Sequence, residues 1–310
     1  MSTTVGIAGI TGKFARELAS ILLKYPNVTI KGYCRNPSKV PQSLSSKVSL
    51  VKGDAFDTTA IRSFAAGCDV VVCCYLGDPK LMVDGQKALI DACAAEGVPR
   101  YVASDWSLDY TKLELGELFP KDPMIHVKAY LDAQEKVKGV HILVGMFTDV
   151  FFSPMFGTWD AASTTFKYWG TGDEVWEATT YRNSAEYTAA VCVDKNAVGV
   201  KKFVGGSSSI REIAESFEKV YGIKPKLERQ GSVDDLYKHM HELRKSNPQN
   251  VFSYMFLFFQ YYAVNGQTHL GPDNDNAKYP QVKPVSWEEY LRSVPKDQLL
   301  NAYSNVGSDV

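Results

Sequence analysis

The sequence predicts an α/β fold built on a doubly wound, mostly parallel β-sheet. In the first half of the chain, short runs rich in β-branched residues alternate with amphipathic stretches, and a glycine-rich turn separates the first run from the first stretch. The runs cover residues 4–8, 28–33, 48–51, 69–75, 101–103 and 140–144, and the helical stretches cover residues 14–24, 58–66, 81–96 and 124–138. Strands that alternate with helices indicate βαβ units, whose strands lie parallel in one sheet.

The residue patterns within these segments support the assignment. The consecutive valines 70–72 are typical of a strand that helices cover on both faces, because no position is left polar. In the first helical stretch, Phe14, Leu18 and Ile21 recur at helical spacing and give one apolar face. We therefore expect the first half to be one domain, residues 1–150.

After about Gly145 the alternation of strand and helix patterns ends. Three later helices are announced by capping boxes, in which a serine precedes an acidic residue by three positions; these are Ser209 with Glu212, Ser232 with Asp235, and Ser286 with Glu289. Residues 265–284 form a long polar loop whose glycine and proline content makes a mobile lid plausible. We expect residues 151–310 to form a smaller, substrate-binding region interleaved with the sheet.

Composition excludes several classes of function. The 310 residues include 34 Lys and Arg against 35 Asp and Glu, so a basic surface for nucleic acid or an anionic membrane is not expected. The six cysteines contain no C-x-x-C pair and the five histidines are not clustered, which argues against a disulfide framework and against a metal site. A strand within the first five residues leaves no room for a leader, so we expect a cytoplasmic protein.

The glycine turn indicates a dinucleotide site. Gly6, Gly9 and Gly12 close the first strand and open the first helix, where small residues let the backbone approach a pyrophosphate and the helix N-terminus stabilises its charge. Such a motif is weak alone and gains weight from its place between a strand and a helix. This predicts a Rossmann-type fold. The residues expected to contact the cofactor in this part of the chain are Gly6, Gly9, Thr11, Gly12, Lys13 and Phe14.

The end of the second strand points to NADPH or NADP⁺. NAD-binding proteins usually place an acidic residue there, whereas this chain has Arg35 followed by Lys39. A guanidinium at Arg35 would pair with a 2′-phosphate. The alternative is a solvated surface arginine. Asp54 and Tyr75, after the third and fourth strands, complete the expected cofactor contacts of the adenosine half.

With these residues, the chain resembles the NmrA-like and isoflavone-reductase-like family of atypical short-chain dehydrogenases. The resemblance rests on ordered motifs spread to about residue 245: the glycine turn, Arg35-Asn36-Pro37, Gly53-Asp54 with Asp57, Gln86, Val102-Ala103-Ser104-Asp105, Lys128-Ala129 and the segment from Asn183 to Tyr187. It implies that Lys128 acts as general acid/base beside the nicotinamide and contacts the cofactor. Ser104 lies at the carboxyl end of the fifth strand, where α/β sheets bind ligands, and is a further catalytic and cofactor-contacting candidate; the alternative is that it belongs to a turn. A desolvated lysine can relay a proton because its pKa is lowered.

Two departures from the family pattern are clear. An ordinary short-chain dehydrogenase has a tyrosine four residues before its lysine, but Met124 stands there, and Tyr110, His126 and Tyr130 are the nearby substitutes. We choose Tyr110 as the third catalytic candidate. Reductases of the family carry Ser-Glu-Phe-Gly where this chain has Ser104-Asp105-Trp106-Ser107.

The aromatic residues after the sixth strand suggest the kind of substrate. Phe147 and Phe151 follow this strand, where the nicotinamide is expected, and an apolar cleft there would suit an aromatic or polycyclic molecule. The leading hypothesis is an NADPH-dependent reductase of an aromatic or polyketide-like carbonyl or conjugated alkene. The alternatives are a non-catalytic NADP-binding redox sensor that acts through a protein partner, which the missing tyrosine favours, and a non-redox isomerase or cyclase.

Overall fold

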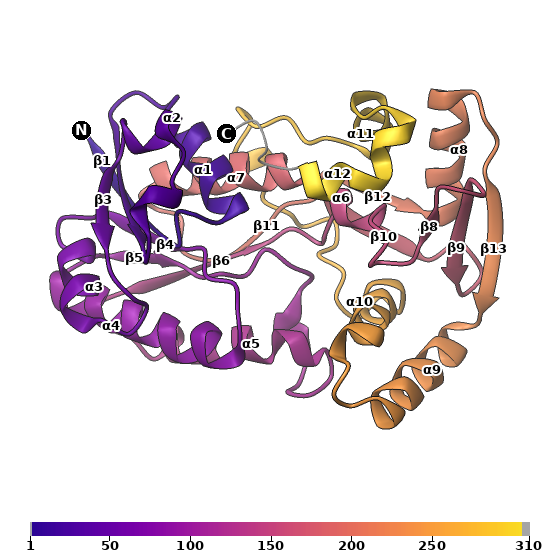
Figure 1. The fold of residues 1–310 in the computed structure, drawn as a ribbon, viewed down its shortest axis with the longest axis horizontal. Helices are drawn as coiled ribbons and strands as arrows, with labels where there is room; N and C mark the ends of the chain where they lie inside the picture. The colour runs from indigo at the N-terminus through magenta and orange to yellow at the C-terminus, as the bar shows by residue number, and fades with distance from the viewer. Residues whose placement is uncertain (1, 306–310) are drawn as a thin grey trace.

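The central sheet contains seven parallel strands in the order β11-β6-β5-β4-β1-β2-β3 (Figure 1). The structure, a computed structural model, describes residues 2–305. The strands are β1 (Thr3–Ala8), β2 (Val28–Cys34), β3 (Ser49–Lys52), β4 (Val70–Cys73), β5 (Arg100–Val102), β6 (Lys138–Leu143) and β11 (Gly199–Lys202). Because the direction of winding reverses between β1 and β4, the expected doubly wound α/β fold is confirmed, and a crevice is expected at that switch point.

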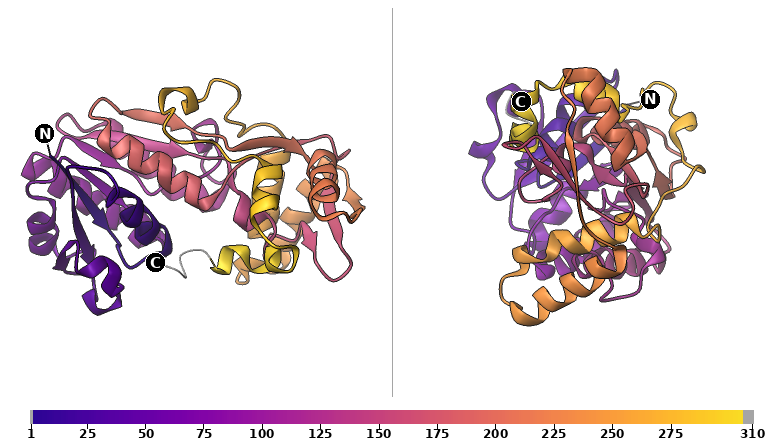
Figure 2. Two further views of the ribbon diagram at one scale, coloured as in Figure 1. Left: turned by 90° about the horizontal axis from the view of Figure 1, so that it is seen from above. Right: turned by 90° about the vertical axis from the view of Figure 1, so that its right-hand side faces the viewer.

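Helices cover both faces of this sheet (Figures 1 and 2). On one face α1 packs against α7, and on the other α4 packs against α3 and α5. Their bounds are α1 (Lys13–Leu22), α3 (Thr58–Ala65), α4 (Gln86–Glu96), α5 (Asp122–Asp132) and α7 (Tyr181–Val193), with the short α2 (Gln42–Ser45) after β2. Val70 and Val72 face the α1 side, whereas Val71 and Cys73 face the other core. A strand buried on both faces explains the unbroken apolar run.

The helix expected over residues 124–138 is shorter than its pattern suggested, which is a correction. It begins at Asp122 and ends at Asp132, and Lys138 already pairs with Arg100 as the first residue of β6. The end of the predicted helical segment therefore forms part of a β-strand, because it pairs with β5 in the sheet. The stretch 81–96 is also divided, because its first turn is the π-helical η2 (Leu81–Gly85).

The second half adds two small sheets and returns to the large one through α7 and β11. The small sheets contain β7 (Met146–Phe147), β10 (Val175–Thr179) and β12 (Gly206–Ser209), and β8 (Trp159–Asp160), β9 (Thr165–Trp169) and β13 (Lys226–Gly231). The remaining α-helices are α6 (Thr148–Phe151), α8 (Ile210–Tyr221), α9 (Val233–Ser246), α10 (Met255–Val264), α11 (Trp287–Ser293) and α12 (Ala302–Asn305). The short 3-10 helices are η1 (Pro37–Lys39), η3 (Tyr110–Lys112), η4 (Phe119–Lys121), η5 (Val251–Ser253), η6 (Asn276–Lys278) and η7 (Lys296–Asn301).

The three expected capping boxes are confirmed at the starts of α8, α9 and α11. In each, the serine hydroxyl and the acidic side chain satisfy backbone N–H groups that the helix leaves unpaired. Between α10 and α11 the long polar loop contains only the short η6. The last five residues of the expected region 151–310 lie outside the described range. Within residues 2–305, no helix is long and apolar enough to cross a membrane.

Candidate active site

A cavity of about 460 Å³ lies at the carboxyl ends of β1, β2 and β4. This is the crevice expected at the switch point of a doubly wound sheet. Six of the residues expected to hold a cofactor contribute to its wall: Gly9, Thr11, Gly12, Arg35, Asp54 and Tyr75.

The glycine turn is shaped for a close approach by a ligand. Gly9 has φ +80°, and a Cβ there would lie 2.9 Å from the carbonyl oxygen of Cys74. Gly12 is the N-cap of α1 and supplies no side-chain cap, and the first turn of the helix contains no acidic residue. Unpaired N–H groups and the positive end of the helix dipole therefore point toward an anionic ligand.

Two cationic side chains, Arg35 and Lys80, line this crevice, and Arg35 is the one that follows β2. Its side chain is exposed at the cavity wall, and within residues 2–305 it forms no ion pair. Lys39 is also exposed, but it lies in η1 and does not line the cavity. The Asp54 carboxylate accepts a hydrogen bond from the N–H of Phe56 at 3.1 Å, so it shapes the loop after β3 as well as the wall.

Two exposed apolar side chains at the rim were not expected from the sequence. Phe56 and Leu76 are 43% and 86% exposed, and both line the cavity. The Lys80 ammonium lies 5.2 Å from the centroid of the Phe56 ring. Large apolar groups left in water beside a cavity are typical of a surface that a flat ligand covers. Their exposure is visible only in the structure, since their sequence neighbourhoods look like ordinary loops.

Three other residues of the expected cofactor set lie away from the cavity wall. Gly6 is in the middle of β1, where a Cβ would lie 3.0 Å from the Cys68 sulfur, so its small size serves packing. Lys13 donates from Nζ to the carbonyl oxygens of Tyr303 and Ser304, at 3.2 and 3.0 Å. The chain's last described segment therefore lies beside the start of α1, as Figure 1 shows. Phe14 is buried.

Phe14 contacts a residue at the end of β5. Its ring centroid lies 4.1 Å from that of Trp106, whose Nε1 donates to Thr188 Oγ1 at 2.9 Å. Trp106 has φ +30°, a conformation that is unfavourable for a bulky residue. The surrounding contacts hold this strained residue between the glycine turn and α7.

Ser104 and Tyr110, two of the catalytic candidates, are both buried and hydrogen-bonded. The Ser104 hydroxyl donates to the carbonyl oxygen of Tyr75 at 2.7 Å. The Tyr110 hydroxyl lies 3.1 Å from Asp105 Oδ2, which is also 2.7 Å from Nδ1 of His141. Burial and then the Asp105 carboxylate raise the pKa of Tyr110 well above its usual range. Tyr110 is thus a hydrogen-bond donor in a buried network.

Lys128 lies on α5 and is paired within its own helix. Its Nζ donates to Asp132 Oδ2 at 2.6 Å, and its side chain is 26% exposed. It does not line the nucleotide cavity. Met124, which occupies the position of the family's tyrosine, is buried on the same helix. The structure therefore does not bring Lys128 into contact with Ser104 or Tyr110 through any direct hydrogen bond among the described residues.

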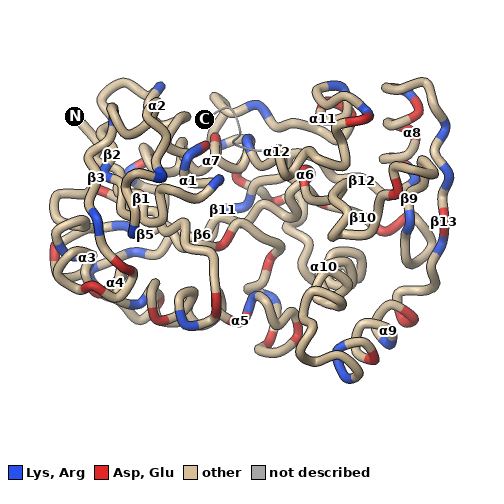
Figure 3. The backbone as a smooth tube through the Cα atoms, in the orientation of Figure 1, with Lys and Arg blue, Asp and Glu red and all other residues tan. Residues whose placement is uncertain are grey.

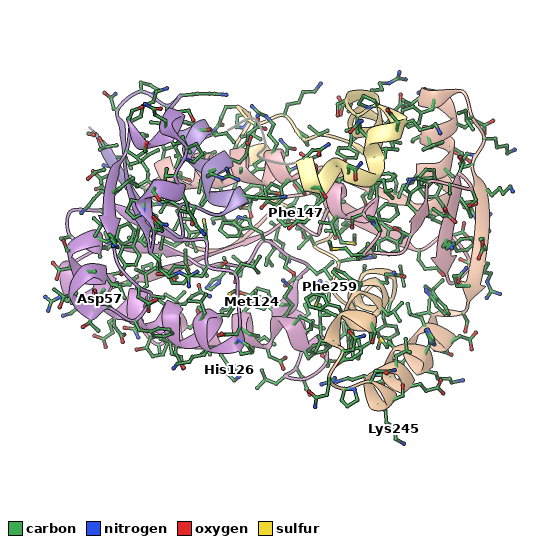
Figure 4. The ribbon with its side chains drawn as sticks, viewed as in Figure 1. Asp57, Met124, His126, Phe147, Lys245 and Phe259 are labelled. Atoms are coloured by element: carbon green, nitrogen blue, oxygen red, sulfur yellow. The ribbon has the colours of Figure 1, made fainter. Side chains whose placement is uncertain are left out.

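A second cavity, of about 160 Å³, is lined by Trp106. Phe147 of β7 lines it, together with Phe256 and Phe259 from α10. Figure 4 labels Phe147 and Phe259 near the middle of the molecule, on segments from distant parts of the chain. Lys121 is the only Lys or Arg of the cavity wall.

Phe151, the second expected substrate contact, is elsewhere. Its ring is fully buried and lies 5.3 Å from the Trp176 ring and 5.0 Å from that of Trp287, measured between centroids. It does not line the second cavity. Of the two phenylalanines, only Phe147 is available to a ligand.

Comparisons with known proteins support a nucleotide-binding role for the crevice. Residues 9–142 match a family model described as NAD(P)H-binding. An NmrA-like family domain-containing oxidoreductase of Gibberella moniliformis is 25% identical over 241 residues, which cover 72% of this chain and 78% of that protein. The chain is therefore similar to an NAD(P)H-binding family over residues 9–142, and to an NmrA-like oxidoreductase over most of its length.

Solved structures of low sequence identity share the fold of this chain over most of its length. An isoflavone reductase superposes with a TM-score of 0.77 at 18% identity, covering 94% of this chain and 99% of that one. The protein AtPrR2, solved with NADP⁺ and (+)pinoresinol, gives 0.75 at 18% identity with the same coverage. An NADPH-dependent quinone oxidoreductase of Escherichia coli, solved with NADPH, gives 0.73 at 18% identity and covers 93% and 99%.

The residues of this NAD(P)H-binding domain fit the cofactor. A glycine cradle that a Cβ would fill, an uncapped helix N-terminus and an unpaired arginine suit two phosphates and a further anionic group. Charges elsewhere are mixed, with acidic and basic residues interspersed along the backbone (Figure 3). Within residues 2–305, no group of three or more His, Cys, Asp or Glu side chains is placed to hold a metal.

Proposed function

We propose that this protein is an NADPH-dependent reductase of an aromatic or polyketide-like small molecule, acting on a carbonyl or a conjugated alkene. One observation carries the proposal: an aromatic cavity is lined by Phe147 of β7 and by Trp106, and the Trp106 ring packs on Phe14 in the helix that follows the glycine turn. Mostly apolar cavities with few polar groups are typical of small-molecule sites. The names of the structural neighbours refer to isoflavone, pinoresinol and quinone, all of them cyclic, conjugated or aromatic compounds.

The preference for NADPH over NADH is assigned to Arg35. Its guanidinium lines the nucleotide cavity without a protein partner, and no acidic residue stands beside it at the end of β2 to hold ribose hydroxyls. An arginine fork suits a phosphate because it donates two parallel hydrogen bonds. Lys39, outside the cavity wall, adds positive charge nearby.

We assign the transfer of a proton to the substrate to Lys128, as the family resemblance implies. A bound NADPH supplies the hydride. Lys128 must exchange its ion pair with Asp132 for the substrate, and a single bond within one exposed helix face is weak enough to be exchanged. Ser104 and Tyr110 serve this proposal as positioning residues, because their hydroxyls already donate to Tyr75 and Asp105.

The test is NADPH consumption with a panel of naphthoquinones and aromatic enones, followed at the nicotinamide absorbance. The wild type should turn over at least one compound, and Lys128→Ala should lower kcat by about 100-fold, the usual contribution of a general acid. The control is Asp132→Asn, which removes the partner but keeps the lysine and should retain activity. Lys128→Ala with unchanged kcat would refute the assignment.

The same panel separates the alternatives. A non-catalytic sensor would bind NADPH without consuming it with any compound, and the buried Met124 in place of the family's tyrosine is the observation that favours such a protein. An isomerase or cyclase would form product at constant NADPH.

A further inference from the structure

The second cavity is lined by several aromatic side chains and by one cationic side chain, Lys121. Lys121 is the last residue of η4, and its Nζ lies 5.4 Å from the centroid of the Phe259 ring. Apart from this cation–π contact, the side chain has no ion pair or hydrogen bond among the described residues. Burial lowers the pKa of Lys121 to about 8, so the amine is still mostly protonated at neutral pH.

Other lysines of this region are paired, which makes Lys121 unusual. Lys112 and Lys202 both reach the Asp109 carboxylate, at 3.8 and 3.0 Å. The carboxylate that acts on Lys121 through space is Asp105, but its Oδ2 already receives Tyr110 and His141. Among the described residues the amine therefore has no carboxylate in direct contact, and a buried charge without such a partner is unfavourable unless a ligand supplies one.

The shape of the cavity limits that ligand. Phe147, Phe256 and Phe259 offer flat apolar surfaces, and Trp106, which packs on Phe14 of α1, forms another part of the wall. An aromatic ring system fills such walls by stacking and edge contacts. A ring that also carries an ionised oxygen would place this oxygen at Lys121 and satisfy the amine with a charge-assisted hydrogen bond.

We propose that Lys121 selects aromatic ligands that carry a carboxylate or phenolate oxygen, and anchors that oxygen in the cavity lined by Phe147 and Phe259. The inference rests on the proposed function, because it places the substrate of the reductase in this cavity. Lys121 is here a specificity residue, distinct from Lys128, which is assigned the proton.

The experiment compares two probes of equal size, 2-naphthoate and 2-naphthamide, by calorimetric titration with and without NADP⁺. The wild type should bind the anion about tenfold more tightly than the amide, as expected for one charge-assisted bond. Lys121→Met should abolish this preference while leaving the affinity for the amide within about twofold, and Lys121→Arg should retain part of it. The matched control is Lys245→Met, on α9 and far from Phe147 in Figure 4, which should behave as the wild type.

Three other results are possible, and each would refute a different part of the proposal. Equal preference for the anion in wild type and Lys121→Met would refute the anchor while leaving the reductase proposal intact. Binding of neither probe to a folded protein that still binds NADPH would refute the anchor and remove the cavity as the substrate site. Failure to bind NADPH would instead refute the proposed function. The two failures can be distinguished, because the preference between the probes is also measured in the absence of the cofactor.

Discussion

The ring of Trp106 packs on the ring of Phe14, with 4.1 Å between the centroids. Phe14 belongs to the first turn of α1, next to the glycine turn, and Trp106 follows β5, so the contact joins the carboxyl ends of two strands of the sheet. Trp106 also lines the second cavity. Trp106 therefore connects the first turn of α1, which follows the glycine turn, to the wall of the aromatic cavity.

Replacing Trp106 should test this connecting role. Trp106→Ala is expected to lower the free energy of unfolding by about 3 kcal/mol, because a large buried ring and its contacts are lost. Trp106→Phe keeps a ring against Phe14 but loses the Nε1 bond to Thr188, and should cost about 1 kcal/mol. Chemical denaturation measures both values. Equal loss in the two variants would show that the ring contact with Phe14 contributes little.

The buried pair of Asp105 and His141 should be strongly coupled. Removing one partner of a buried, hydrogen-bonded pair leaves the other unpaired, so Asp105→Asn and His141→Leu should each destabilise by about 3 kcal/mol. The double variant should cost less than the sum of the two. A double-mutant cycle of unfolding free energies gives the coupling, expected at about 1–3 kcal/mol. Strict additivity would contradict the network.

Lys121→Met should stabilise the ligand-free protein in a pH-dependent way. The pKa of this amine is about 8 in the folded state and ordinarily 10.5, so the folded state disfavours the charged form. Below pH 8 the amine is charged in both states and the penalty is complete, and it disappears as the pH rises toward 10.5. The variant should gain roughly 1–3 kcal/mol at pH 7 and much less at pH 10.

Unfolding at the two pH values measures this gain, and Asp105 is the carboxylate that opposes the shift by favouring the charged amine. Lys245→Met serves again as the exposed control and should change stability at neither pH. A destabilised Lys121→Met at pH 7 would mean that the amine has a partner that compensates its charge.

The carboxyl-terminal segment should compete with phosphate for Lys13. The Lys13 ammonium donates to the carbonyl oxygens of Tyr303 and Ser304 beside the helix that opens the cofactor site. Removing residues 302–310 is expected to raise NADPH affinity by about threefold at low salt. The Lys13 ammonium would then be free to pair with a phosphate of the cofactor, and such an exposed pair contributes only a small binding free energy. Lys13→Met in the shortened chain should cancel the gain. Unchanged affinity after shortening would show that Lys13 takes no part.

Local patterns explain how much of this structure was predictable. The valines 70–72 and the glycine turn placed β4, β1 and the start of α1 within one or two residues, and all three capping boxes were correct, because these signals lie within a few positions of each other. The helix expected to residue 138 failed at its end, since pairing of Lys138 beside Arg100 is a contact between distant strands.

The candidate site was predictable only in its nucleotide half. Lys121 stands in the loop-like run Phe119-Pro120-Lys121 and looks like any exposed lysine. Its aromatic surroundings come from Phe256 and Phe259, far along the chain, and no local pattern reveals them. Phe151 shows the reverse error: an aromatic residue near the right strand belongs to the core, because its helix turns the ring toward Trp176 and Trp287.

The most direct test of the account is a fluorescence titration of the protein with NADPH and with NADH, repeated with Arg35→Ala. The account predicts that the wild type binds NADPH more tightly, and that the substitution weakens NADPH binding by about tenfold or more while NADH changes by less than about twofold, because one charge-assisted pair with the 2′-phosphate is lost. Equal weakening for both nucleotides, or no preference in the wild type, would contradict the assignment of Arg35 as the residue that selects NADPH.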